Sequence, residues 1–123
     1  MNSNNNFFSS NQKIRKISEI TDEAIIFSDH SSITFDHDQD CCENNYAAFD
    51  ALDDLARNYT FRGKIRFEAV DESGFRFGDA RRMFFVPCYS SQNGYYSSDI
   101  QIYFNENGKT RKVLDFEAEL DLY

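Results

Sequence analysis

Residues 100–122 read IQIYFNENGKTRKVLDFEAELDL and contain the clearest fold signal in the chain. Ile100, Ile102 and Phe104 alternate with other residues, which is the period of a half-buried β-strand. Asn107-Gly108 follows, and this pair is typical of a type I′ turn, because both central residues of that turn need a positive φ. A last strand closes the chain, with these alternate residues: Thr110, Lys112, Leu114, Phe116, Ala118, Leu120 and Leu122. The stretch therefore predicts an antiparallel β-hairpin.

Similar β-rich runs occur nearer the N-terminus. Residues 13–20 mix isoleucines with polar residues and favour a strand. Residues 23–29 and 33–36 read as two short strands, and the polar tetrad 29–32 joins them. Two β-rich runs with a polar turn between them predict a second hairpin.

One helix is expected in the middle of the chain, over residues 46–57. Ala48, Leu52 and Leu55 have the spacing of one helical face. Asparagines suited to the two ends of this helix flank it: Asn44, Asn45 and Asn58.

Strands resume after this helix. Residues 59–69 largely alternate, with Gly63 marking a bulge or bend. Residues 71–74 form a turn, and the apolar run 83–88 indicates a strand buried on both faces, with its length limited by Pro87. Residues 89–94 read as a loop.

These elements predict an α+β fold, in which an antiparallel sheet of about six or seven strands packs with one helix. The expected order is β-β-β-α-β-β-β-β. Residues 1–12 form a flexible Asn/Ser-rich tail in this interpretation, and residues 13–123 form a single domain, which suits the chain length of 123 residues.

Composition limits the classes of partner. The net charge is −8, and a surface of this sign attracts neither phosphate backbones nor anionic lipid. Basic residues that follow the expected helix, interleaved with aromatic ones, resemble a base-stacking face, but the net charge disfavours nucleic acid. The first residues lack the features of a secretory signal, and together with the odd count of three cysteines this argues against a disulfide scaffold. The sequence therefore predicts a cytoplasmic protein with no membrane association.

The densest cluster of reactive side chains is DHDQDCCE, residues 36–43. Its opening resembles a calcium loop, but Cys41 stands where glycine is needed and Ala47 where glutamate is needed, so an EF-hand is excluded. One nitrogen, one thiolate and a carboxylate can still bind a metal ion, and the candidate ligands are His37, Asp40, Cys41 and Glu43.

The adjacent thiols have two other interpretations. Cys41 or Cys42 is a nucleophile if His37 or His30 acts as its base, although neighbouring carboxylates disfavour a thiolate. Alternatively, one cysteine packs as a small hydrophobic residue beneath the expected helix.

Three segments resemble a known family. These are the block from His37 through Gln39 to Glu43, the acidic helix 50–55, and the block 91–97. Together they are similar to a domain-of-unknown-function family of small uncharacterised proteins from bacteria and their phages, with H-x-Q-D-C-C-E and S-N-G-Y-Y-S blocks. Here Gln92 separates the serine from Asn93, which departs from the second block. The resemblance covers about residues 14–104 and implies a shared domain and a phage or mobile-element setting, but no reaction.

If the two blocks act together, they meet across the sheet; alternatively each is structural, because turns favour Asn-Gly and strands favour tyrosine. The candidate ligand or interaction site is His37, Gln39, Asp40, Cys41, Cys42, Glu43, Asn93, Tyr95 and Tyr96. The sequence favours an accessory or protein-interaction module that binds another protein through its acidic surface, without a cofactor. A metal- or ligand-binding domain and a thiol enzyme are the alternatives, and the oligomeric state stays open.

Overall fold

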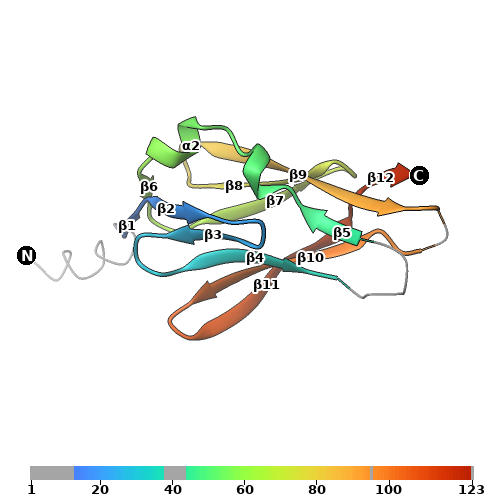
Figure 1. Ribbon diagram of the computed structural model, residues 1–123. Helices are drawn as coiled ribbons and strands as arrows, with labels where there is room; N and C mark the ends of the chain where they lie inside the picture. Colours follow the sequence, from blue (N-terminus) through green and yellow to red (C-terminus); the bar gives the residue numbers. More distant parts are fainter. Residues whose placement is uncertain (1–12, 38–43, 95, 123) are drawn as a thin grey trace, which may run out of the picture.

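Two β-sheets lie face to face in the computed structural model, which describes residues 13–37, 44–94 and 96–122 (Figure 1). The expected tail 1–12 lies outside the described residues. The prediction of a sheet-rich protein is confirmed, but the single sheet is wrong, because the strands divide between two layers that bury a common interior.

The first sheet has the strand order β11-β10-β4-β3-β2, and every neighbouring pair is antiparallel. Its strands are β2 (Ile17–Ile20), β3 (Ala24–Phe27), β4 (Ser32–Asp36), β10 (Asp99–Glu106) and β11 (Lys109–Glu117). Both predicted hairpins lie in this sheet. Asn107 and Gly108 have φ values of 55° and 77°, as the type I′ turn requires.

The second sheet has the order β12-β9-β8-β7, with β5 also paired to β9. Its strands are β5 (Asn44–Ala47), β7 (Arg66–Val70), β8 (Gly74–Gly78), β9 (Met83–Gln92) and β12 (Glu119–Leu122). The expected last strand is thus two strands, because the chain leaves the first sheet after β11 and β12 joins the second. There β12 runs parallel to β9, whereas the other described strand pairs are antiparallel, so the expectation that antiparallel pairing dominates is confirmed. A short pair joins β1 (Ile14–Arg15) to β6 (Phe61–Arg62).

The predicted helix over residues 46–57 is wrong. Asn44 and Asn45 belong to β5 and do not cap a helix; a single 3-10 turn, η1 (Phe49–Ala51), and a short α2 (Leu55–Asn58) follow. The apolar residues of this segment are buried all the same: Ala47, Phe49, Leu52 and Ala56. Pairing with β9 satisfies the backbone N–H and C=O groups of β5. The strand is therefore favoured over a helix, although the apolar spacing fits both.

The expected end of β9 near Pro87 is also wrong, since β9 continues through the predicted loop to Gln92. Pro87 is the last residue of β9 paired with β8, opposite Gly74. From Cys88 onward, β9 pairs with β5, and from Tyr89 with β12. A proline is tolerated here because it stands where one edge of the strand changes partner.

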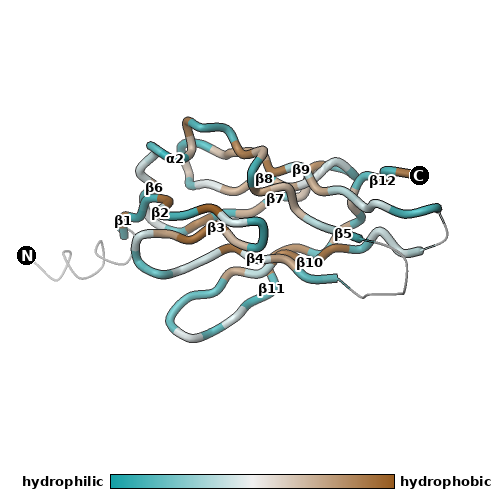
Figure 2. The backbone as a smooth tube through the Cα atoms, in the orientation of Figure 1, coloured by the Kyte–Doolittle hydropathy of each residue, from teal (hydrophilic) through white to brown (hydrophobic). Residues whose placement is uncertain are grey.

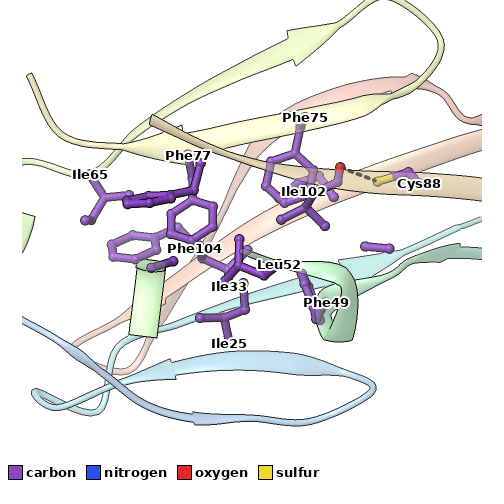
Figure 3. Packing of buried hydrophobic residues seen from close by; sticks show 14 of the residues in the cluster. Ile25, Ile33, Phe49, Leu52, Ile65, Phe75, Phe77, Cys88, Ile102 and Phe104 are labelled. Carbon is purple, nitrogen blue, oxygen red and sulfur yellow. Dashed lines mark hydrogen bonds between the residues drawn. The ribbon is translucent and has the colours of Figure 1, made fainter. Parts of the chain in front are cut away.

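The core lies between the two sheets. Apolar stretches follow the strands, whereas the β2–β3 and β10–β11 turns are hydrophilic (Figure 2). Phe75 and Phe77 of the second sheet face Ile25 and Ile33 of the first across the interior (Figure 3). Ring contacts cross the same interface, with centroid distances of 6.3 Å for Phe27–Phe77, 5.7 Å for Phe67–Phe104 and 6.4 Å for Phe75–Phe116. Among the described residues, no helix has the length and apolar character to cross a membrane.

Candidate functional site

A cleft of about 380 Å³ opens where the β2–β3 turn approaches β4, β5 and η1. Three carboxylates and two aromatic rings contribute to its wall. The lining residues are Asp22, Glu23, Phe35, Asn44, Tyr46, Ala47, Ala48 and Asp50. We name this set the acidic cleft. It combines negative charge with apolar surface, which suits a ligand that carries a positive charge beside a hydrophobic group.

The β2–β3 turn places two of the carboxylates. The Thr21 hydroxyl accepts hydrogen bonds from the backbone N–H groups of Glu23, at 3.2 Å, and Ala24, at 3.0 Å. The Thr21 N–H donates to the Ala24 carbonyl at 2.9 Å. These bonds fix a tight turn, so Asp22 and Glu23 occupy a defined position at its tip.

The three carboxylates of the acidic cleft are exposed and available to a ligand. No residue that the structure describes forms an ion pair with Asp22, Glu23 or Asp50. Their mutual repulsion is therefore offset only by solvent and salt, and a bound cation would relieve it.

Aromatic packing holds the apolar part of the cleft. The ring of Phe35, from β4, meets the buried ring of Phe49, from η1, edge-on with centroids 5.7 Å apart. Tyr46, from β5, packs against Tyr89 of β9 at 5.8 Å. Both cleft rings are half-buried, so each is anchored on one side and open on the other.

A buried polar network fixes β5 beside the cleft. Asn45 is 1% exposed, and its side-chain amide donates to the Ser97 carbonyl at 3.0 Å and the Asp99 carbonyl at 2.9 Å. Its carbonyl oxygen accepts a short hydrogen bond from the Ser90 hydroxyl. Gln92, fully buried, donates to Ser90 at 2.6 Å and to the Ser97 carbonyl at 3.3 Å. We name Asn45, Ser90 and Gln92 the amide network.

The amide network connects the flanks of the two sequence blocks. Asn45 follows the first block by two residues, and its partner Ser97 ends the second. Gln92 also accepts a hydrogen bond from the Tyr96 N–H at 2.8 Å, which fixes the chain beyond Asn93. These contacts are structural, because they satisfy the buried polar side chains of Asn45, Ser90 and Gln92.

The candidate residues of the first block are mostly outside the described part of the chain: Gln39, Asp40, Cys41, Cys42 and Glu43, together with Tyr95 of the second block. His37 is described, half-buried after β4, and its N–H donates to the Asp36 carboxylate at 2.8 Å. Within residues 13–37, 44–94 and 96–122, no three histidine, cysteine or acidic side chains group closely enough to hold a metal ion. The metal and thiol hypotheses for residues 36–43 stay predictions.

The third cysteine has a different environment. Cys88 is fully buried in β9, and burial raises the pKa of its thiol to about 12. A thiol that stays protonated is a poor nucleophile, so Cys88 packs as a core residue.

Sequence reasoning missed most of the acidic cleft. The sequence pattern places Glu23 and Phe35 in expected strands and Tyr46 and Asp50 in the expected helix, and it predicts no binding role for these residues or for Asp22. The available signal was the concentration of acids around residues 36–54, but only the tertiary fold brings the β2–β3 turn to that segment.

A second charged cluster, near β1, is structural. Arg15 is 3% exposed and lies between the rings of Phe27 and Phe104, with its guanidinium carbon 6.0 and 5.5 Å from their centroids. It donates to Glu106 at 3.3 Å, and its Nε lies 3.7 Å from the Asp29 carboxylate. These contacts compensate a buried cation and tie β1 to the β3–β4 turn and the adjacent end of β10.

This cluster predicts a loss of stability in acid. Burial alone would raise the pKa of Asp29, but hydrogen bonds from Ser31 and the charges of Lys13 and Arg15 lower it from 3.8 to about 2. The folded pKa is below the unfolded one, so the stabilisation is complete above about pH 4 and disappears as the pH falls toward 2. We expect Asp29→Asn to cost about 1–2 kcal/mol at neutral pH. Urea unfolding between pH 2 and 5 should show a flatter profile for this variant than for the exposed-site control Asp115→Asn; equal profiles would contradict the assignment.

Comparison of the chain with protein-family models, with curated proteins and with solved structures found no match. The resemblance of the two sequence blocks to a phage and bacterial family stays a prediction from the sequence. Any function proposed for the chain depends on its own residues and their geometry.

Proposed function

We propose that this protein is an interaction module that binds a partner protein through the acidic cleft. The partner segment carries lysine or arginine beside an aliphatic or aromatic side chain. One observation supports the proposal: three exposed carboxylates and the half-buried rings of Phe35 and Tyr46 line the same cleft. None of these carboxylates forms an ion pair with a residue that the structure describes.

Each part of the cleft has a distinct contribution to such binding. The carboxylates of Asp22, Glu23 and Asp50 attract the cation, and the face of Tyr46 or Phe35 offers a cation–π contact of about 0.5–1 kcal/mol at an exposed site. The net charge of −8 supports the same choice of partner, because it steers basic proteins toward the surface and repels acidic ones.

An accessory role in the cytoplasm, in a phage or mobile-element setting, is part of the proposal and depends on the sequence alone. Enzymatic activity is not proposed, because no nucleophile with an oriented base is present among the described residues of the cleft.

Peptide selection tests the proposal. Immobilised protein is used to select from a random peptide library, and the enriched peptides are sequenced and their affinities measured by fluorescence anisotropy. We expect enrichment of lysine or arginine adjacent to a hydrophobic residue. The triple variant Asp22→Asn/Glu23→Gln/Asp50→Asn should bind these peptides about 3- to 150-fold more weakly, since each exposed ion pair contributes about 0.2–1 kcal/mol.

A matched variant separates the cleft from net charge. Glu72→Gln/Glu119→Gln/Asp121→Asn removes the same three charges from exposed positions outside the acidic cleft. We expect it to retain wild-type affinity within about threefold at physiological salt. Equal weakening by the two triple variants would show that overall charge, and not the cleft, attracts the peptides.

A further inference from the structure

A groove of about 500 Å³ lies between the edges of the two sheets, where β7 approaches β11. The elements that form it are different from those of the acidic cleft. Its lining residues are Lys64, Ile65, Arg66, Phe67, Arg111, Lys112 and Val113. We name this set the basic groove.

The charge of the basic groove is opposite to that of the whole protein. Four cations line it in a chain whose net charge is −8. Lys64, Arg66 and Arg111 are exposed and form no ion pair with any residue that the structure describes, whereas Lys112 contacts Asp115 at 3.3 Å. Local acids thus leave most of this positive charge uncompensated, although acids outnumber bases by 21 to 13 overall.

Both walls of the basic groove are strand edges. Within the described residues, β7 pairs only with β8 and β11 pairs only with β10. The β7–β8 register is regular from Arg66 to Val70, so β7 presents an even row of backbone N–H and C=O groups. In β11 the register shifts between Lys112 and Leu114, which leaves Val113 as an extra residue. A β-bulge changes the direction of the neighbouring side chains. At this bulge three consecutive residues, 111–113, line the groove.

The floor of the basic groove is apolar and already packed. Ile65 is 3% exposed, and Phe67 lies against Phe104 of the first sheet with ring centroids 5.7 Å apart. Phe67 is the single aromatic residue of the lining, and its ring is engaged. Phe67 is half-buried, so the groove lining offers a base this one ring, whereas single-stranded nucleic acid is bound by stacking successive bases on several rings, and this favours a peptide.

We infer that the basic groove binds an acidic peptide segment in extended conformation, which adds as a strand to the free edge of β7. Backbone hydrogen bonds to β7 supply affinity that is independent of sequence. In an extended peptide, alternate side chains point to opposite faces, so acidic residues reach Arg66 and Arg111 while apolar ones cover Ile65 and Val113. The protein thus carries two binding surfaces of opposite charge.

Titration of ¹⁵N-labelled full-length protein with the peptide acetyl-EVEVEVE-amide tests this inference. We expect chemical-shift changes at residues 64–70 and 109–114, and none with the reversed-charge peptide acetyl-KVKVKVK-amide. A peptide with N-methyl groups on alternate residues keeps the charge but cannot form one set of backbone hydrogen bonds. Two such peptides are made, one with N-methyl groups on the odd residues and one with them on the even residues. One of the two should bind at least about tenfold more weakly than the unmethylated peptide.

Two triple variants locate the binding. Lys64→Gln/Arg66→Gln/Arg111→Gln should weaken the acidic peptide at least about tenfold. Arg57→Gln/Arg62→Gln/Arg81→Gln removes three exposed cations outside the basic groove and should stay within about threefold of wild type. Wild-type-like spectra of both variants without peptide show that the fold is retained.

Three results would overturn the inference. These are the absence of shifts at residues 64–70, equal weakening by the two triple variants, and binding of a single-stranded thymidine oligonucleotide in place of the acidic peptide. In the first case the groove cations would only protect two strand edges from pairing with other chains.

Discussion

Phe61→Ala is expected to lower the free energy of unfolding by about 4 kcal/mol, the largest effect of any single change considered. Phe61 is fully buried in β6, and four aromatic rings surround it. The centroid distances are 4.8 Å to Tyr59, 5.6 Å to Phe27, 5.7 Å to Phe77 and 5.8 Å to Phe84. Because these rings come from both sheets and from the connection between them, neighbouring residues cannot easily collapse into the cavity that alanine leaves.

Urea unfolding measures this effect, and Phe85→Ala is its control. Phe85 belongs to β9 but is 41% exposed, so its truncation should cost less than about 1 kcal/mol. The account of the core would be contradicted if the two phenylalanines proved equally important to stability.

Asn45→Ala is the second large effect, at about 2–4 kcal/mol. The truncation removes the Asn45 donor from the Asp99 carbonyl, leaves the Ser97 carbonyl with its 3.3 Å hydrogen bond from Gln92, and removes the acceptor of the Ser90 hydroxyl. Ser90 is buried, so water cannot readily replace the bond that its hydroxyl loses, whereas the contacts to the Ser97 and Asp99 carbonyls are part-buried and solvent compensates part of their loss. The exposed Asn58→Ala serves as the control and should change stability by less than about 0.5 kcal/mol.

A double-mutant cycle tests whether the amide network acts as a unit. Asn45 and Gln92 both bond to Ser90 and to the Ser97 carbonyl. Gln92→Ala in the Asn45→Ala background should therefore cost less than in wild type, with a coupling energy of at least about 0.5 kcal/mol. Additive effects would mean that the two amides stabilise the fold independently.

The parts of the fold that could be predicted from the sequence are those set by nearby residues. The turn at Asn107-Gly108 and the polar turn before Ile33 each join two strands that pair with one another. Alternation along β10 placed Ile100, Ile102 and Phe104 correctly on the buried face. A hairpin needs no distant partner, so a few residues specify it.

The errors come from pairings between segments far apart in the chain. The spacing of apolar residues after Asn45 fits a helix equally well, and pairing with β9 decides for a strand. Residues 119–122 continue the alternation of β11, yet they join the other sheet beside residues 89–92. Alternation defines two faces of a strand, but it does not identify the sheet to which the strand belongs.

The candidate sites were hidden for the same reason. Asp22 and Asp50 are 28 positions apart (50 − 22), and Lys64 and Arg111 are 47 apart (111 − 64). Each pair meets only once the two layers have formed. The sequence directed attention to residues 36–43, whereas the described part of the acidic cleft draws on the segments before and after them.

The most direct test of the proposed function is where a basic peptide binds. Wild-type ¹⁵N-labelled protein is titrated with a peptide from the library selection, and shift changes are mapped onto the backbone. Binding in the acidic cleft predicts that the largest changes fall at Asp22, Glu23, Phe35, Tyr46 and Asp50. Changes confined to other surfaces, such as β12 or the outer face of β8, would contradict the proposal that this cleft is the binding site.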